Sequence, residues 1–314
     1  MPQPLRTIAF TRLEQLLSRP IEDVQDFPAR REARARLQRS RAGRALFGTP
    51  DPGVETFERT VRIDGRLRRV LVHRPHAGTD LPAVLNLHGG GWVQGHPEQS
   101  AWFASRVAAR TGAVVVSPEY RLAPEEPFPA AVEDSWSALE WLADEGASLD
   151  ADPTRLAVMG DSAGGGLAAT VALLARDAGG PALRAQILLY PGVEAYDRWP
   201  SEDEHARAAV LTSRNMRAFV RFYLGEEYGT TDWRASPIRH VDHRGLPPTL
   251  VVVAGRDPLA DNGRRYAERL GSQGVHVRLE EFGDAVHGFA SLPGVQPRAR
   301  AAVRVAADFL GQHL

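Results

Sequence analysis

The sequence contains no cysteine, and this absence removes several classes of site at once. Disulfide bonds, thiolate metal ligands and a cysteine nucleophile are all excluded. Lysine is absent as well, so arginine supplies all 38 basic side chains, and 39 acidic side chains leave a formal net charge of −1. A charge so close to zero gives no reason to expect nucleic acid or an anionic membrane as the main partner.

Long apolar runs and a recognisable leader are also missing. The longest apolar run, Leu167–Ala175, is too short to cross a bilayer. The first ten residues lack the charged-then-apolar order of a signal peptide. We therefore expect a cytoplasmic protein that does not insert stably into a membrane.

What the sequence does have is a regular alternation of short apolar runs with helical patterns. The apolar runs are Ala83–Leu87, Ala113–Val116, Leu156–Met159, Ile187–Leu189, Leu250–Val253 and Val275–Phe282. Before them, Val54–Ile63 and Arg69–Arg74 alternate apolar and polar residues around Asp64-Gly65, which is typical of a hairpin. This order predicts an α/β fold whose mostly parallel sheet of about eight strands carries helices on both faces.

Two segments depart from that alternation. Residues 1 to about 50 are helical in pattern and carry seven arginines between Arg30 and Arg44, which form either a solvated helix face or a patch for a membrane or partner. Between Pro191 and Pro237 there is no strand pattern, only an acidic cluster and an amphipathic helix near Ser213–Leu224. An insertion after a strand end is a candidate lid, and the alternative is a long surface excursion.

The clearest chemical motif is Gly160-Asp161-Ser162-Ala163-Gly164, placed between an apolar strand and a helical stretch. A sharp strand-to-helix turn lifts a serine above the end of a sheet, and flanking glycines remove the Cβ atoms that would collide there. Ser162 is therefore predicted to be a nucleophile. The N–H of Ala163 would point at the developing oxyanion from a helix N-terminus.

A serine nucleophile requires a base and an orienting carboxylate. Asp257 follows the strand Thr249–Ala254, and Pro258 could start the next helix and fix that carboxylate, so we prefer Asp257 to its competitor Asp261. His287 lies on a loop after the last strand, and the chain order Ser162, Asp257, His287 is that of an α/β-hydrolase triad. The remaining candidate histidines fit less well: His73, His76, His240 and His243. The last two have metal-like spacing but no third ligand nearby, so we expect neither a metal nor a cofactor.

The glycine run His88-Gly89-Gly90-Gly91-Trp92 supplies further oxyanion donors, because consecutive glycines leave their N–H groups bare. We assign these donors to Gly90 and Gly91, with Ala163 as the third. His88 is interpreted as a structural residue that supports the loop together with Gly89, rather than as a base. Trp92 could line the site, although a core position is the default for such a side chain.

These motifs resemble the bacterial hormone-sensitive lipase family of the α/β-hydrolase superfamily. The resemblance extends to Tyr120–Glu125, Leu211-Thr212 and Ala235-Ser236-Pro237, and covers most of the chain from residue 50. It implies an α/β-hydrolase catalytic domain over residues 51–314, an N-terminal helical cap segment over 1–50 and a cap insertion at about 192–236.

The function implied is a serine carboxylesterase that hydrolyses short- to medium-chain acyl esters through an acyl-enzyme. Its expected partners are a small-molecule ester and, from the habits of the family, a second copy in a homodimer. An amidase or arylformamidase with the same triad remains the first alternative. A non-catalytic binder is the second, disfavoured because such relatives lack the histidine that stands here at His287.

Overall fold

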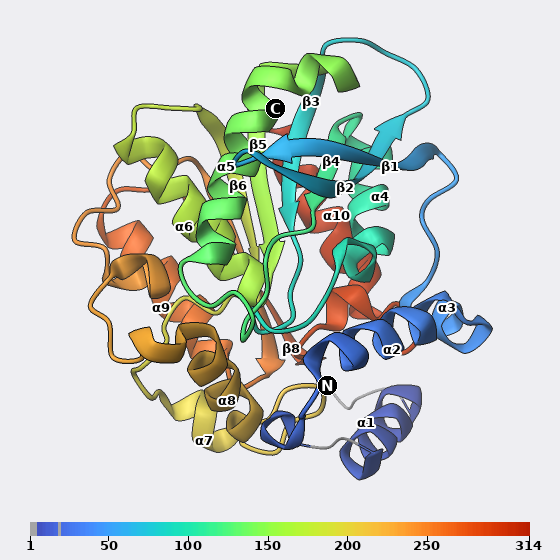
Figure 1. The fold of residues 1–314 in the computed structure, drawn as a ribbon, viewed down its shortest axis with the longest axis vertical. Coiled ribbons are helices and arrows are strands. Elements are labelled where there is room, and N and C mark those ends of the chain that lie inside the picture. The colour runs from blue at the N-terminus through green and yellow to red at the C-terminus, as the bar shows by residue number, and fades with distance from the viewer. Residues whose placement is uncertain (1–4, 18–19) are drawn as a thin grey trace.

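An eight-stranded sheet forms the centre of the protein in the computed structural model, which describes residues 5–17 and 20–314 (Figure 1). Residues 1–4, at the start of the predicted cap segment, and 18–19 lie outside that description. The strands are β1 (Val54–Ile63), β2 (Arg66–Pro75), β3 (Leu81–Leu87), β4 (Val114–Pro118), β5 (Ala151–Asp161), β6 (Leu183–Leu189), β7 (Thr249–Arg256) and β8 (Val277–Val286). They lie in the order β1-β2-β4-β3-β5-β6-β7-β8, and β2 is antiparallel to both of its neighbours while the pairs from β4 to β8 are parallel.

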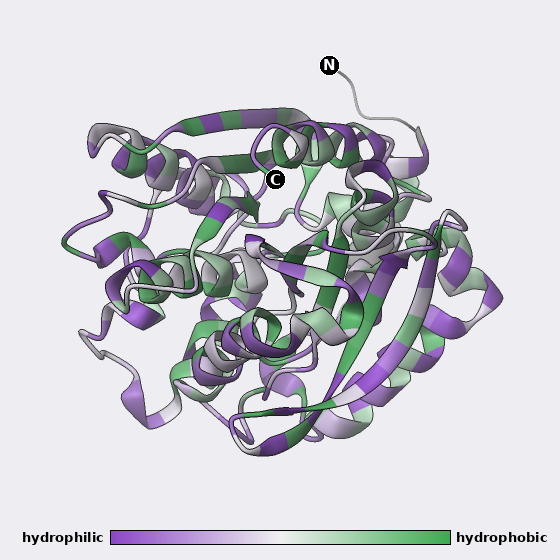
Figure 2. Ribbon diagram, turned by 90° about the horizontal axis from the view of Figure 1, so that it is seen from above, coloured by the Kyte–Doolittle hydropathy of each residue, from purple (hydrophilic) through white to green (hydrophobic). Residues whose placement is uncertain are grey.

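Helices cover both faces of this sheet, as the alternation predicted. One face carries α4 (Ala101–Thr111) and α10 (Arg298–Gly311), and the other carries α5 (Ala130–Glu145), α6 (Ala163–Asp177) and α9 (Ala260–Ser272). In β4, Val114 and Val116 join the core cluster with α5 and α6, whereas Val115 joins the cluster with α4 and α10. Because successive side chains point to opposite faces, an uninterrupted apolar run is what a strand buried on both sides requires. These strands form the green centre of Figure 2.

The predicted hairpin is confirmed with its turn. Asp64 and Gly65 both have positive φ, 49° and 67°, as a two-residue turn of the mirror-image type demands. The predicted strand lengths were less accurate: β5 begins at Ala151, five residues before the apolar run, because its polar first half still pairs with Leu81 of β3. Apolar periodicity finds the buried middle of a strand and misses its exposed ends.

Two segments far apart in sequence meet beyond the carboxyl ends of the strands, in the lower part of Figure 1. The first contains α1 (Leu5–Leu17), α2 (Phe27–Arg39) and α3 (Arg41–Phe47), and the second contains α7 (Pro200–Glu204) and α8 (Ser213–Leu224). The Ile21 N–H donates to Asn215 Oδ1 at 3.1 Å, and the Phe27 and Phe222 rings meet edge to face at 5.0 Å. We call these two segments together the cap.

The arginine-rich stretch is mostly solvated, but Arg30 and Arg31 are partly buried. Arg31 extends from α2 across the cap boundary, where its Nε donates to Val93 O at 2.7 Å and its Nη2 to Ala123 O at 2.6 Å. The same guanidinium pairs with Glu125 at 2.7 Å. Arg31 therefore fastens the N-terminal helices to the loops that contain Val93, Ala123 and Glu125. None of the helices in the described part of the chain combines the length and apolarity needed to span a bilayer.

Candidate active site

Ser162 stands at the turn from β5 into α6, in the strained conformation that the motif predicted. Its φ of 57° and ψ of −121° are rarely adopted by a residue with a Cβ, and bonds to both sides hold it there: its N–H donates to Leu189 O at 2.9 Å, and its C=O accepts from Gly192 N at 3.0 Å. A Cβ on Gly160 would lie 2.2 Å from Gly164 O, and one on Gly164 would lie 2.0 Å from Leu87 O. The turn is therefore open only to glycine at these two positions.

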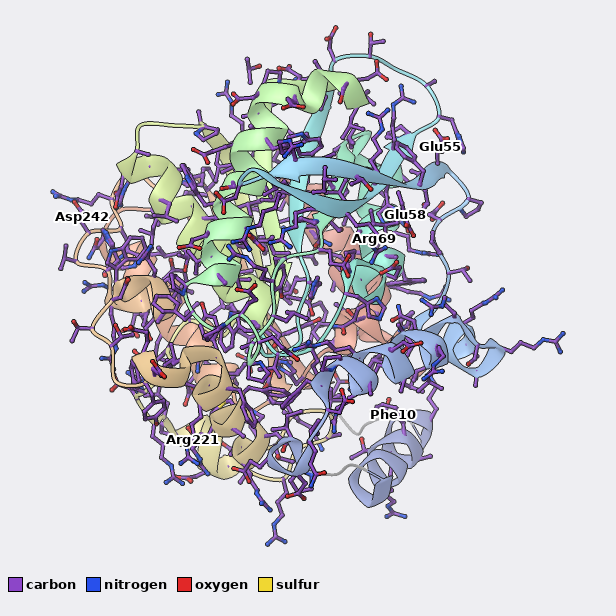
Figure 3. The ribbon with its side chains drawn as sticks, viewed as in Figure 1. Phe10, Glu55, Glu58, Arg69, Arg221 and Asp242 are labelled. Carbon is purple, nitrogen blue, oxygen red and sulfur yellow. The ribbon has the colours of Figure 1, made fainter. Side chains whose placement is uncertain are left out.

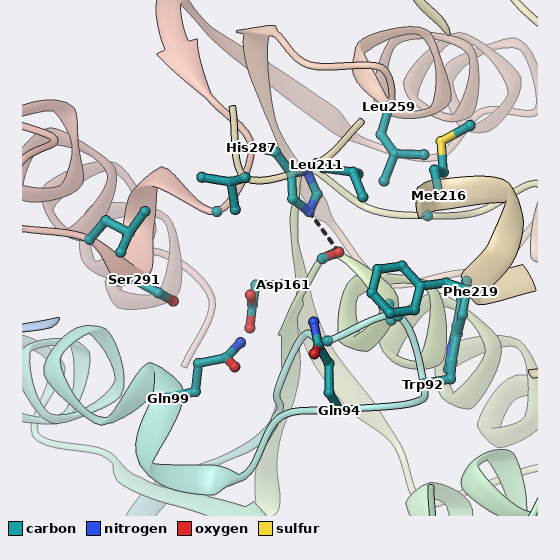
Figure 4. A pocket seen from close by; sticks show the side chains of 18 of the residues that line it. Trp92, Gln94, Gln99, Asp161, Leu211, Met216, Phe219, Leu259, His287 and Ser291 are labelled. Atoms are coloured by element: carbon teal, nitrogen blue, oxygen red, sulfur yellow. Dashed lines mark hydrogen bonds between the residues drawn. The ribbon is translucent and has the colours of Figure 1, made fainter. Parts of the chain in front are cut away.

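Ser162, His287 and Asp257 lie in one hydrogen-bonded row. His287 Nε2 is 2.8 Å from Ser162 Oγ, and His287 Nδ1 is 2.6 Å from Asp257 Oδ2 (Figure 4 shows the first contact). Asp257 is fully buried, and its Oδ1 accepts the Leu259 N–H at 2.9 Å. Both oxygens of the Asp257 carboxyl group therefore have a partner, and the loop after β7 holds this side chain in position to orient the imidazole.

The structure corrects one detail of this loop. The helix after β7 begins at Ala260 rather than at Pro258, so the predicted helix start was two residues early. Asp257 is instead held by the Leu259 N–H on its side chain and by the Ala260 N–H on its C=O. The competing carboxylate, Asp261, turns away toward the cap, where it accepts from Ser201 N at 2.9 Å and pairs with Arg264.

The other histidines lie apart from this row. Their partners are Thr56 for His73, Pro52 for His76, Asp177 and Asp242 for His240, and Pro237 for His243. In the described residues, no group of three potential ligands has the arrangement that a metal ion needs.

The glycine loop passes close to Ser162, and Gly90 and Gly91 line the same cavity as Ser162. Gly90 has a φ of 132°, and a Cβ there would lie 1.8 Å from Gln94 O; Gly91 has a φ of 63° and packs against the Phe219 ring. Within the described residues, the hydrogen bonds include no acceptor for the N–H groups of Gly90, Gly91 or Ala163. Three bare donors beside a serine hydroxyl can stabilise a developing oxyanion.

His88 supports this loop from beneath. It is fully buried, stacks on Tyr120 with ring centroids 4.3 Å apart, and its C=O accepts from Tyr120 Oη at 2.6 Å. Burial lowers the pKa of His88 to about 4, so the ring is neutral at ordinary pH. Gly89 is tied down by its N–H, which donates to Asp161 Oδ1 at 2.9 Å.

A cavity of about 220 Å³ opens over Ser162 and has two kinds of wall (Figure 4). Its apolar side includes Trp92, Leu211, Met216, Phe219 and Leu259, and its polar side includes Gln94, Gln99, Asp161 and Ser291. Phe10 and Phe47 from the N-terminal helices also line it (Phe10 is labelled in Figure 3). The cap thus contributes much of the apolar surface on which a substrate would lie.

Sequence reasoning gave Asp161 no role, although the residue stands beside the predicted nucleophile. Its carboxyl group is buried against the glycine loop, and burial raises its pKa to about 6 despite the Gly89 N–H and the nearby His287 ring, which both lower it. An acidic residue directly before the nucleophile was the available signal. The aromatic and aliphatic cap residues could have been found from the apolar stripe of Ser213–Leu224, but not their contact with Gly91.

Several known proteins are similar to this chain in sequence and in structure. A family model described as alpha/beta hydrolase fold matches residues 84–291. Carboxylesterase NlhH of Mycobacterium tuberculosis is 41% identical over 273 residues, which cover 85% of this chain and 84% of the relative. An ethyl acetate hydrolase of Pseudomonas putida is 32% identical over 90% of both chains. Among solved structures, a hyperthermophilic esterase from the archaeon Pyrobaculum calidifontis superposes with a TM-score of 0.89 at 36% identity over 99% of both chains.

The sheet order, the strained serine turn and the glycine loop define an α/β-hydrolase, as predicted. Within that class, the chain belongs to the bacterial hormone-sensitive lipase family, and it is a carboxylic ester hydrolase.

Proposed function

We propose that this enzyme is a serine carboxylesterase that hydrolyses short- to medium-chain acyl esters through a covalent acyl-enzyme. The observation that carries the proposal is the row from Asp257 through His287 to Ser162, with separations of 2.6 and 2.8 Å, at the floor of a cavity with one apolar wall. In this reading Ser162 is the nucleophile, His287 the general base and acid, and Asp257 the group that orients the ring.

In the acylation step, His287 Nε2 takes the Ser162 Oγ proton while Oγ bonds to the ester carbonyl carbon. The carbonyl oxygen becomes negatively charged and accepts hydrogen bonds from the N–H groups of Gly90, Gly91 and Ala163. When this tetrahedral intermediate collapses, the bond to the alkoxide breaks, and the alkoxide leaves as an alcohol with the proton from His287. Asp257 stabilises the imidazolium in between.

In the deacylation step, water takes the place of the alcohol. His287 removes one water proton as the oxygen attacks the acyl carbon, and the same oxyanion donors hold the second intermediate. Collapse releases the carboxylic acid and returns the proton to Ser162 Oγ. Each atom and charge is accounted for by the three side chains, the three N–H groups and one water, so the cycle needs no cofactor.

The preference for short to medium acyl chains is supported by the size and enclosure of the cavity. About 220 Å³ closed by cap residues such as Met216 and Phe219 suits a small ester better than a long triglyceride chain. The similarity to an ethyl acetate hydrolase points in the same direction.

Three measurements test the proposal. A fluorophosphonate should add one covalent adduct per chain, detected by intact mass, and the adduct should be lost in Ser162→Ala; labelling that survives in the variant would contradict the assignment of the nucleophile. A series of p-nitrophenyl esters from acetate to palmitate should show its largest kcat/KM at short or medium length, and a maximum at palmitate would make the enzyme a lipase. Turnover of a matched aryl amide equal to that of the ester would favour an amidase.

A further inference from the structure

A second hollow lies between α4 and α10, which pack side by side on one face of the sheet (Figure 1). It has a volume of about 250 Å³ and shares no lining residue with the active-site cavity. Its walls carry four guanidinium groups against a single carboxylate. The residues that line it are Asp51, Trp102, Arg106, Arg110, Arg300 and Arg304, together with Val303.

The positive charge here is largely uncompensated. Within residues 5–17 and 20–314, Arg110, Arg300 and Arg304 form no ion pair, and Arg106 is 3.8 Å from Asp51. Asp51 is itself engaged, since its Oδ1 accepts the Gly53 N–H at 2.9 Å. For a chain with a net charge of −1, this is a strong local concentration of one sign.

The spacing of these arginines makes their crowding unfavourable in the empty state. Arg106 and Arg110 are four residues apart on α4, Arg300 and Arg304 are four apart on α10, and like charges at this spacing destabilise a helix. Arg300 also lies in the first turn of α10, which contains no acidic residue, where the helix dipole favours negative charge. Burial, with a contribution from Arg300, lowers the pKa of Arg106, although Asp51 opposes this shift. An anion in the hollow would offset the repulsion between these arginines and the unfavourable positive charge at the start of α10.

We propose that the hollow between α4 and α10 binds a small phosphate-class oxyanion, such as inorganic phosphate or a diphosphate group. Guanidinium groups pair with phosphate through two parallel N–H···O bonds, and a tetrahedral anion offers acceptors in several directions to forks that converge from two helices. A monocarboxylate offers only two acceptors in one plane. Arg106 Nη1 donates to Thr49 O at 2.9 Å, so the site also touches the linker that follows α3 of the cap.

The experiment is a titration of the full chain with phosphate, pyrophosphate and acetate at constant ionic strength, read by calorimetry and by the melting temperature. Phosphate should bind saturably and raise the melting temperature, pyrophosphate should bind more tightly, and acetate should do neither. The double variant Arg300→Gln/Arg304→Gln should weaken binding by on the order of tenfold or more. Its turnover of p-nitrophenyl butyrate without phosphate should equal that of the wild type. A failure of the anion-site proposal can therefore be distinguished from a failure of the esterase proposal, on which it does not depend.

The matched control is Arg41→Gln/Arg221→Gln, which removes the same charge from exposed positions outside the hollow (Arg221 is labelled in Figure 3). This control should bind phosphate as the wild type does. Equal weakening in both double variants, or acetate as effective as phosphate, would overturn the proposal in favour of diffuse charge. Binding to phosphatidylglycerol vesicles without any response to phosphate or pyrophosphate would overturn it as well.

Discussion

Asp257 and Asp261 are four residues apart, yet their surroundings separate their roles. Asp257 is fully buried and 2.6 Å from His287 Nδ1, whereas Asp261 accepts from Ser201 N and pairs with Arg264 at 3.0 Å. The preference for Asp257 could be argued from the sequence because an acid just past a strand end lies at the same sheet edge as the nucleophile. What Asp261 does instead could not, because Ser201, which donates its N–H to Asp261, comes from the cap.

The first prediction compares these two carboxylates. Asp257→Asn should lower kcat on p-nitrophenyl butyrate by about 10⁴-fold, because the imidazole loses the partner that fixes its tautomer. The isosteric control Asp261→Asn should leave kcat within the same order of magnitude. Comparable losses in the two variants, with both proteins folded by circular dichroism, would contradict the assignment of Asp257.

The second prediction concerns Asp161. Because its pKa is raised to about 6 in the folded protein, above the ordinary value of 3.8, the folded state holds this proton more tightly than the unfolded chain does. The resulting stabilisation is present at low pH and is lost as the pH rises through 6. Asp161→Asn keeps an acceptor for the Gly89 N–H and removes the buried charge, so it should raise the melting temperature at pH 8 by a few degrees, and less at pH 5.

The control for Asp161 is Asp232→Asn. The Asp232 pKa is lowered, since hydrogen bonds from Arg234 outweigh its partial burial, so losing this charge should lower the melting temperature at pH 8. An equal shift for Asp161→Asn at pH 5 and pH 8 would show that its carboxyl is not strained by burial.

At the scale of elements, the cap is where sequence reasoning had least to work with. The helical character of residues 1–50 and of Ser213–Leu224 was visible in their patterns, and the structure contains helices in both segments. Their docking onto each other was not visible, because contacts such as Phe27 with Phe222 join residues nearly two hundred positions apart. The division into cap and catalytic domain remains a prediction about how these parts behave.

The third prediction tests how the cap is fastened. Arg31→Gln removes the donors to Val93 O and Ala123 O and the pair with Glu125, which together should be worth about 1–3 kcal/mol of docking. We expect KM to rise more than kcat falls, and trypsin to cut the N-terminal helices sooner. Arg36 lies on the same helix, but its guanidinium is exposed and its ion pair with Glu32 is long at 3.9 Å. Arg36→Gln should therefore change neither the kinetic constants nor the rate of proteolysis. Identical kinetics and proteolysis for both variants would show that Arg31 does not anchor the cap.

At the scale of the whole molecule, three fully buried histidines link stability to pH. Burial lowers the pKa of His73, His88 and His243 to about 4 in each case. The unfolded chain gains these protons below about pH 6.5, while the folded protein does not until about pH 4. Stability should therefore fall across that window, and the opposing effect of the raised pKa of Asp161 should offset only part of the loss.

The fourth prediction follows from this loss of stability at acidic pH. The free energy of unfolding, measured in urea, should drop by several kcal/mol between pH 7 and pH 5, at about 1.4 kcal/mol per pKa unit for each imidazole. His243→Gln keeps a donor near Pro237 O and should make the drop smaller, whereas His76→Gln, at an exposed position, should not. A free energy of unfolding that stays constant or rises toward pH 5 would contradict this role of the buried histidines.

The cytoplasmic location and the homodimer stay predictions.

The sequence alone determined the fold class and the chemistry of the serine turn. A strand, two glycines and a helix are local and contiguous, and backbone sterics dictate what such a turn can do with Ser162. Only the tertiary structure decided which residues line the cavity, why the pKa of Asp161 is raised, and that Arg106 and Arg300 line one hollow between two helices. Burial and charge density depend on segments brought together from distant positions, and no local pattern specifies them.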